Sequence, residues 1–202
     1  MTKIILERHG QSIGNAEGIY LGHTDLGLTE LGLAQAKRTA EHLISERIDA
    51  IYSSDLKRAY ETAYEHAKIR NIDVIQLQEL REMYVGEWEG RLVSELLSEC
   101  YEQFKIRRTY RDFCYPGGEG VYDAYLRLKG ALAKIAEENE GKTVLVVCHS
   151  ALIRAFWYFL HGYTDENMKD RVEDIKNAAY SVLTYEGGVF TPISHNNKAH
   201  LA

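Results

Sequence analysis

The sequence predicts an α/β fold, a three-layer α/β/α sandwich with a mostly parallel mixed sheet. Short runs rich in β-branched residues alternate with longer segments whose apolar residues recur at helical spacing, a pattern typical of parallel strands covered by helices. Near the end of the chain, two strand-like runs flank a Gly-Gly turn with no helix between them. The first observation predicts the parallel part of the sheet, and the second adds an antiparallel hairpin.

Four short runs are the candidates for parallel strands. They are residues 3–6, 50–53, 73–77 and 143–147. Two apolar stripes at helical spacing, 33–44 and 121–135, are each wide enough to cover one face of the sheet. The two strands of the hairpin are expected at 178–185 and 188–193.

The length of 202 residues is typical of a single domain, because one hydrophobic core fills a chain of about this size. We find no internal repeat and no linker rich in Pro, Ser or Gly. Residues 83–116 are the least regular part and mix aromatic with charged residues. We interpret them as a helical insertion that covers one end of the sheet and the site expected there, where it shapes a pocket.

The charge balance excludes broad classes of partner. Lys and Arg number 24 against 30 Asp and Glu, and the net charge of −6 offers no footprint for a nucleic acid. The longest apolar runs, 144–148 and 155–160, are far shorter than the ~20 residues that span a bilayer. The N-terminus carries charges at both ends of a very short apolar stretch, unlike a signal peptide. We therefore expect a cytoplasmic protein without membrane contact.

Cysteine usage indicates neither disulfides nor a metal site. Cys100, Cys114 and Cys148 are an odd number with no C-x-x-C spacing. We interpret them as free thiols in a reducing compartment, and Cys148 as a small buried hydrophobe at the end of an apolar run. No spacing of Asp and His suggests metal ligands, so neither a metal nor another cofactor is expected.

Basic residues follow three of the predicted strands at the point where each strand ends. Arg8 and His9 follow the first strand, and Arg58 and His149 follow two others. Singly, each has an ordinary structural explanation, such as a packed histidine or a surface ion pair. Ligands of doubly wound folds bind outside the carboxyl ends of the strands, so these side chains are expected to meet at one edge of the sheet.

Such a cluster suits a phosphoryl group. An arginine presents a planar fork of donors that stays charged, and a neutral imidazole is a competent nucleophile. Gly10 allows the backbone to approach closely, while Gln11, Ser12 and Asn15 add neutral donors. A helix that starts at Ser150 would aim free N–H groups at the same anion. The sequence thus predicts a compact anion site in an acidic chain.

Six motifs stand in a definite order along the chain. They are Arg8-His9-Gly10-Gln11-Ser12-x-x-Asn15, Asp25-x-x-Leu28-Thr29-x-x-Gly32-x-x-Gln35-Ala36, Ser53-Ser54-Asp55-Leu56-x-Arg58-Ala59-x-x-Thr62-Ala63, Glu82-x-x-x-Gly86-x-Trp88-Glu89-Gly90, Pro116-Gly117-Gly118-Glu119 and Val146-Val147-Cys148-His149. A tail of Asn196-x-x-x-His200-Leu201 follows them. In combination they closely resemble the histidine phosphatase superfamily, also called the cofactor-dependent phosphoglycerate mutase-like family. The resemblance covers nearly the whole chain and implies a phosphoglycerate mutase-like fold.

The resemblance implies a role for each matched residue. His9 is the implied nucleophile that becomes a phosphohistidine, and Glu82 is the implied proton donor to the leaving group. The implied phosphate-binding set is Arg8, Arg58 and His149. Supporting contacts to phosphate or substrate are implied at Asn15, Ser12 and Gly22. The family uses no metal for this chemistry.

Electrostatics adds an expectation for the nucleophile and the acid. His9 must be neutral to attack, and the neighbouring Arg8, Arg58 and His149 are expected to lower its pKa by disfavouring a further positive charge. Glu82 must carry a proton when the ester oxygen leaves. It can then act as general base toward the water that hydrolyses the phosphohistidine.

Three other carboxyl groups stand near the implied acid. They are those of Glu79, Glu87 and Glu89, and the spacing to Gly86 and Trp88 selects Glu82 among them. Two positions depart from the family's pattern. Ser150 stands where the family usually has glycine, and it can cap the following helix or donate to phosphate as part of the substrate site. Gly120 stands where the family often has serine, which leaves the shape of the substrate open.

Three functions are compatible with these motifs. The leading one is a metal-independent phosphatase that hydrolyses a small phosphorylated metabolite through His9. A phosphoglycerate mutase-type phosphotransferase is the alternative, disfavoured because the family's mutases carry extra residues in the middle of the chain. A sensor of phosphorylated ligands without catalysis is the third, disfavoured by the complete set of implied catalytic residues.

The sequence leaves the substrate open among phosphoserine, α-ribazole phosphate, phosphoglycerates and sugar phosphates. Tyrosines that either line a pocket or simply pack are Tyr20, Tyr84, Tyr101, Tyr110 and Tyr115. Arg107, Arg108 and Arg111 offer a second anionic contact on the insertion, although we favour a solvated basic face. The sequence also leaves a homodimer open.

Overall fold

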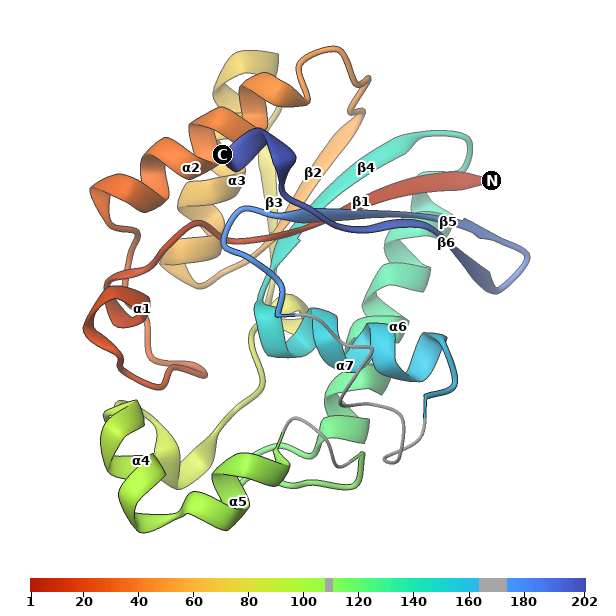
Figure 1. Ribbon diagram of the computed structural model, residues 1–202. Helices are drawn as coiled ribbons and strands as arrows, with labels where there is room; N and C mark the ends of the chain where they lie inside the picture. Colours follow the sequence, from red (N-terminus) through yellow and green to blue (C-terminus); the bar gives the residue numbers. More distant parts are fainter. Residues whose placement is uncertain (108–110, 164–173) are drawn as a thin grey trace.

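The computed structural model describes residues 1–107, 111–163 and 174–202, which contain a six-stranded sheet (Figure 1). Its strands are β1 (Thr2–Arg8), β2 (Ala50–Ser54), β3 (Val74–Leu77), β4 (Thr143–Cys148), β5 (Tyr180–Glu186) and β6 (Val189–Asn197). In the order β3-β2-β4-β1-β5-β6, the first four strands are parallel, while β5 and β6 run antiparallel to their neighbours. The predicted mixed sheet and its hairpin are confirmed.

Helices cover both faces of this sheet, as the three-layer prediction requires. On one face lie α2 (Glu30–His42) and α3 (Lys57–Arg70), and on the other lie α6 (Val121–Glu138) and α7 (Ser150–Leu160) (Figure 1). Alternate residues of the strands are buried in two separate hydrophobic cores, one on each side, because successive side chains of a strand point to opposite faces.

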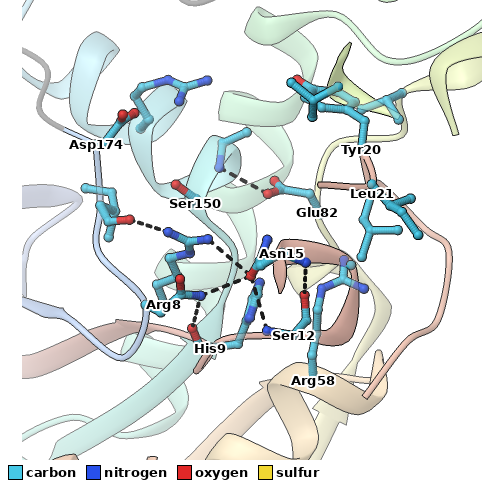
Figure 2. A pocket seen from close by; sticks show the side chains of 18 of the residues that line it. Arg8, His9, Ser12, Asn15, Tyr20, Leu21, Arg58, Glu82, Ser150 and Asp174 are labelled. Atoms are coloured by element: carbon cyan, nitrogen blue, oxygen red, sulfur yellow. Dashed lines mark hydrogen bonds between the residues drawn. The ribbon is translucent and has the colours of Figure 1, made fainter. Parts of the chain in front are cut away.

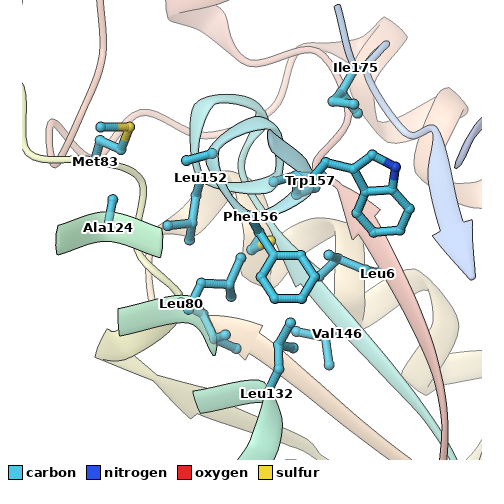
Figure 3. Close-up of a cluster of buried hydrophobic side chains, with 14 of the residues drawn as sticks. Leu6, Leu80, Met83, Ala124, Leu132, Val146, Leu152, Phe156, Trp157 and Ile175 are labelled. Atoms are coloured by element: carbon cyan, nitrogen blue, oxygen red, sulfur yellow. The ribbon is translucent and has the colours of Figure 1, made fainter. Parts of the chain in front are cut away.

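The larger core lies between the sheet and the helices α6 and α7 (Figure 3). Phe156 and Trp157 of α7 pack there with Leu6 of β1, Val146 of β4 and Leu132 of α6. Full burial of one such side chain contributes ~1.5–3 kcal/mol. This core therefore fixes the position of α7, the helix that begins at the carboxyl end of β4.

The helix α2 differs from the stripe predicted over 33–44. Leu33 and Ile44 are 42% and 58% exposed, and the helix ends at His42. Its buried face consists of small residues, namely Gly32, Ala36, Thr39 and Ala40. The physical reason is close packing: small side chains let α2 lie directly against α3, whereas Leu33 and Ile44 are left at the surface. Ala36 and Ala40 of the predicted stripe are buried, and so is Leu43, which follows the helix.

The irregular region 83–116 contains three short helices, η2 (Gly86–Trp88), α4 (Val93–Glu99) and α5 (Tyr101–Ile106). Figure 1 shows α4 and α5 apart from the two helix layers. Trp88 is 2% exposed and forms ring contacts with Tyr20, Phe104, Phe113 and Tyr115. These aromatic side chains belong to the larger hydrophobic core and connect this region to it.

Three smaller elements complete the described chain: α1 (Ile13–Glu17), η1 (Gln78–Leu80) and η4 (Ala199–Leu201). The cysteines are free thiols, as predicted, and Cys148 is fully buried. Among the residues described, no helix is both long and apolar enough to cross a membrane.

Candidate active site

The strands β2, β4 and β1 are neighbours, so the basic residues that follow them meet at one edge of the sheet. A cavity of about 370 Å³ lies there (Figure 2). The predicted site residues that line it are Arg8, His9, Ser12, Asn15, Arg58, Glu82 and Ser150. His149 and Gly22 do not line it. Figure 2 shows His9 and Arg58 at the floor, Glu82 above them, and Asp174 and Tyr20 higher on opposite sides.

His9 is held as a neutral imidazole with one nitrogen free. Its ring is 4% exposed, and Nδ1 lies 2.6 Å from the Gly10 carbonyl oxygen. A carbonyl only accepts, so Nδ1 carries the proton and Nε2 keeps its lone pair. Burial lowers the pKa of His9 well below its usual value, and the charges of Arg58 and Arg8 lower it further. The predicted direction of this pKa shift is confirmed.

His149 stands beside His9, with the ring centroids 5.1 Å apart and the planes at 61°. It is fully buried, and neither ring nitrogen has a hydrogen-bond partner among the described residues. Burial lowers its pKa well below the usual value, and the charge of Arg58 lowers it further. A buried imidazole without a partner is costly unless a ligand satisfies it.

Arg58 is fixed by backbone carbonyls of the loop that precedes α2. Its Nη2 donates to the Gly22 carbonyl at 2.7 Å and its Nη1 to the Thr24 carbonyl at 2.8 Å. The carboxylate of Glu89 holds that loop, because it accepts hydrogen bonds from the backbone N–H groups of residues 22 to 24 and from the Thr24 hydroxyl. Glu89 is thus occupied by structural bonds and does not line the cavity.

The structure places Gly22 beside Arg58 rather than on the cavity lining, and its implied role as a substrate contact stays a prediction. A Cβ atom at this position would stand 2.2 Å from Oε1 of Glu89 and 2.5 Å from the Met83 carbonyl oxygen. Glycine is therefore required for close packing of the loop that orients Arg58.

Arg8 spans from the floor of the cavity to the segment after residue 173. Its Nη1 donates to the Ile175 carbonyl, and its Nη2 lies 3.5 Å from Oδ1 of Asn15. Burial lowers the pKa of Arg8 to about 10, although the carboxylates of Glu82 and Asp174 oppose the shift. Arg8 is therefore still charged at neutral pH.

Ser12 and Asn15 form a capping box at the start of α1. The Ser12 hydroxyl accepts from the Asn15 N–H, and the Asn15 Oδ1 accepts from the Ser12 N–H, each at 3.2 Å. The same Oδ1 accepts from Nδ2 of Asn177 at 3.1 Å. Both side chains line the cavity, but the cap already occupies the Ser12 oxygen.

Glu82 is anchored at the N-terminus of α7. Its Oε1 accepts from the N–H groups of Met83 and Leu152, and its Oε2 accepts from the N–H of Ala151 at 3.1 Å. The N–H groups that we expected to face the anion thus serve the carboxylate instead. The expected cap by Ser150 is also wrong, because His149 is the N-cap residue and Ser150 is the first residue of the helix.

Several residues of the cavity wall were missed or misjudged from the sequence. Arg107 is buried rather than solvated, and its Nε donates to the Tyr20 hydroxyl at 3.1 Å. That hydroxyl lies 2.8 Å from the Tyr115 hydroxyl. Tyr84, Tyr101 and Arg111 do not line the cavity, and Arg108 and Tyr110 lie outside the described residues.

Arg154, Asp174, Ile175, Lys176 and Asn177 also line the cavity. For Arg154 a signal existed, since it follows Ser150 by one helical turn and therefore lies on the same face of α7. No sequence signal pointed to residues 174–177, because contacts with Asn196 near the end of the chain bring them to the cavity. Asn196 holds them there, as its Oδ1 accepts from the Lys176 N–H and its Nδ2 donates to the Asp174 carbonyl.

Within residues 1–107, 111–163 and 174–202, no group of three or more His, Cys, Asp or Glu side chains is placed to hold a metal ion. The charged groups of the cavity are mainly guanidinium groups. Arginine forks match the oxygens of a phosphoryl group, and the neutral His9 presents a nitrogen between them. The arrangement can bind a phosphomonoester and attack its phosphorus.

Comparisons with known proteins agree with this geometry. A family model described as histidine phosphatase superfamily (branch 1) matches residues 4–198. Phosphoserine phosphatase 1 of Hydrogenobacter thermophilus is 37% identical over 188 residues, which are 92% of this chain and 88% of that protein.

Two solved structures are similar over the full length of both chains. YhfR of Bacillus stearothermophilus superposes with a TM-score of 0.92 at 27% identity. The phosphoserine phosphatase of Entamoeba histolytica, in complex with 3-phosphoglyceric acid, superposes with a TM-score of 0.85 at 28% identity.

Proposed function

The chain belongs to the histidine phosphatase superfamily and is a phosphomonoester hydrolase, and we propose that it works through a phosphohistidine formed on His9. The observation that carries the proposal is the state of this side chain. His9 is buried and neutral, and its Nδ1 is tied to the Gly10 carbonyl, so its free Nε2 is the nucleophile.

In the first step, Nε2 of His9 attacks the phosphorus atom and the bond from phosphorus to the ester oxygen breaks. Arg8, Arg58 and His149 hold the phosphoryl oxygens and stabilise the charge that develops on them. Arg58 is fixed by two carbonyl groups before substrate binds, so the entropy of orienting its side chain is lost on folding and not during the reaction.

Glu82 supplies a proton to the departing ester oxygen, which leaves as an alcohol. Oε1 accepts two N–H bonds and Oε2 only one, so a lone pair on Oε2 is available to carry that proton. In the second step, a water molecule attacks the phosphorus of phosphohistidine while Glu82 takes one of its protons. The bond from phosphorus to Nε2 of His9 breaks and returns its electron pair to Nε2, so inorganic phosphate leaves and His9 is again a neutral imidazole.

The substrate is a small phosphorylated metabolite, and phosphoserine is the first compound to test because a relative 37% identical carries that name. Water is the proposed acceptor, which distinguishes this chemistry from that of a mutase. The steps above route nothing through a metal ion, so exhaustive chelation is expected to leave turnover unchanged.

The test is a trapping experiment. After a short incubation with phosphoserine and alkaline quenching, the peptide that contains His9 is expected to carry one added phosphoryl group by mass spectrometry. An unmodified His9 peptide under conditions of rapid turnover would contradict the proposal. A parallel incubation with 3-phosphoglycerate and 2,3-bisphosphoglycerate separates the alternatives: free phosphate supports hydrolysis, and formation of 2-phosphoglycerate indicates a mutase.

A further inference from the structure

We propose that Arg154 anchors a second anion site in the same cavity, which binds a carboxylate carried by the alcohol part of the phosphomonoester. The inference rests on the proposed function, since it concerns the part of the substrate that His9 does not attack. It defines the substrate class as small phosphorylated hydroxy acids or hydroxy amino acids.

The guanidinium of Arg154 is held without a partner. The residue is only 8% exposed and lines the cavity, yet no hydrogen bond or ion pair to it is found within the described residues. By contrast, Arg58 is bonded to two carbonyls, and Arg107 donates to Tyr20. A buried arginine without an anion is costly, so a ligand is the natural source of its missing partner.

Arg154 lies on α7 one helical turn beyond Ser150, so both residues share the face of the helix that lines the cavity. Its charge adds to the lowering of the pKa of Arg8 and opposes the rise in the pKa of Tyr115, another residue that lines the cavity. The charges that lower the pKa of His9 are those of Arg58 and Arg8. We therefore place the alcohol part of a substrate bound at His9 on the side of the cavity that Arg154 lines.

The positive charge of the cavity also exceeds the negative charge of one phosphate. The charged residues that line it in the described chain are the cations Arg8, Arg58, Arg107, Arg154 and Lys176 and the acids Glu82 and Asp174. Cations exceed acids by three with Glu82 ionised, and by four when Glu82 carries the proton for the leaving group. A phosphate monoester carries at most about two negative charges near neutral pH, so at least one positive charge remains for a second anion.

A carboxylate fits this surplus and the available space. It is planar and matches the guanidinium fork with two parallel hydrogen bonds. The cavity of about 370 Å³ is near the lower end of the sizes typical of ligand pockets, so only a short carbon chain separates the two anions. The same cavity is lined by Leu21, Val85 and the Tyr20 ring, whose apolar surfaces suit that short chain.

The experiment compares two substrates that differ by the carboxylate alone, O-phosphoserine and O-phosphoethanolamine. Wild-type kcat/KM is expected to be at least ~10-fold higher for phosphoserine. In Arg154→Met, kcat/KM for phosphoserine is expected to fall ~10- to 100-fold, the range of a charged hydrogen bond, chiefly through KM. The value for phosphoethanolamine should change by less than about twofold, so the preference disappears.

Two further variants serve as controls for the substrate preference. Arg154→Lys keeps the charge but loses the fork, and it is expected to retain an intermediate preference even if the methionine variant fails to fold. Arg111→Met is the matched control, because Arg111 pairs with Asp112 outside the cavity lining. It is expected to keep the wild-type ratio.

Two outcomes would overturn the inference while leaving hydrolysis intact. One is a wild-type enzyme that turns over both substrates equally or prefers a bisphosphate. The other is an equal loss for both substrates in Arg154→Met, which would make the arginine a phosphate ligand or a structural residue. Failure of the proposed function itself looks different, because His9 would then stay unmodified during turnover or 2-phosphoglycerate would form, whatever Arg154→Met does to the substrate preference.

Discussion

The floor and the wall of the cavity are built in different ways. On the floor, Arg58 is held by two backbone carbonyls and His9 by one, and both follow strands in the middle of the sheet. On the wall, side chains also hold one another: Arg107, which donates to the Phe104 carbonyl, donates as well to Tyr20, and Tyr20 meets Tyr115. Arg154, on a helix face, has no hydrogen-bond partner among the described residues.

This difference separates reaction from recognition. Groups fixed by backbone at the ends of neighbouring strands keep one geometry, which suits attack on phosphorus whatever the alcohol. Side chains that contact one another can change in sequence without disturbing the sheet, so they suit discrimination between substrates. Changes on the floor should therefore reduce kcat, and changes on the wall should act mainly on KM.

The largest effect is expected from His9→Ala. It removes the nucleophile, and kcat toward any phosphomonoester should fall by at least ~10⁴-fold. Phosphate release under single-turnover conditions measures this, with circular dichroism as the check on folding. Retained hydrolysis of an aryl phosphate in a folded variant would remove His9 from the nucleophile role.

A smaller, selective effect is expected from Glu82→Gln. The amide keeps the size of the side chain but cannot deliver the proton, so kcat for alkyl phosphates should fall by ~10²- to 10⁴-fold. p-Nitrophenyl phosphate has a good leaving group and should lose much less in the step that forms phosphohistidine. Burst kinetics with both esters measure that step, and equal losses would argue against a general acid.

Glu89→Gln tests the residue that holds the loop behind Arg58. Its carboxylate accepts from four donors of the loop that carries the carbonyls of Gly22 and Thr24, so the amide should loosen Arg58. We expect kcat/KM to fall on the order of 10-fold for all substrates alike. Steady-state kinetics with phosphoserine and p-nitrophenyl phosphate decide it. A loss confined to one of them would place Glu89 in recognition instead.

The neutral His149, buried beside His9, makes folding stability depend on pH. The folded-state pKa of His149 is lowered, so an unfolded chain binds protons near pH 6.5 that the folded chain rejects. Stability is therefore fully present above pH 6.5 and declines as the pH falls toward the folded pKa. His149→Gln should reduce the loss between pH 7 and pH 5 by about 1–2 kcal/mol in urea unfolding. An unchanged pH dependence would contradict a neutral, buried His149.

The smallest effect is expected on the wall from Tyr20→Phe. It removes the hydroxyl that accepts from Arg107 and contacts Tyr115. We expect KM for phosphoserine to rise by about two- to tenfold, the worth of one hydrogen bond, with kcat changed less than about twofold. A kcat loss as large as that of Glu89→Gln would erase the distinction between floor and wall.

Much of the fold was predictable because it depends on local patterns. β-Branched runs gave the strands, and Gly187 and Gly188, both at positive φ, gave the hairpin turn. The buried face of α2 was predictable in part: Ala36 and Ala40 of the predicted stripe are buried, whereas Leu33 and Ile44 are exposed. The roles of His9, Glu82, Arg8, Arg58 and His149 remain predictions, although all of these residues except His149 line one cavity.

The sequence by itself determined the parallel strands that bring Arg8, His9, Arg58 and His149 to one edge, because parallel strands end on the same side. Only the tertiary structure decided the order of these strands, which N–H groups serve Glu82, and which arginine has no partner among the described residues. Those outcomes depend on contacts between Glu82 and α7, and between Asn196 and the segment beside Asp174, that are far apart in the chain. No local pattern encodes such contacts.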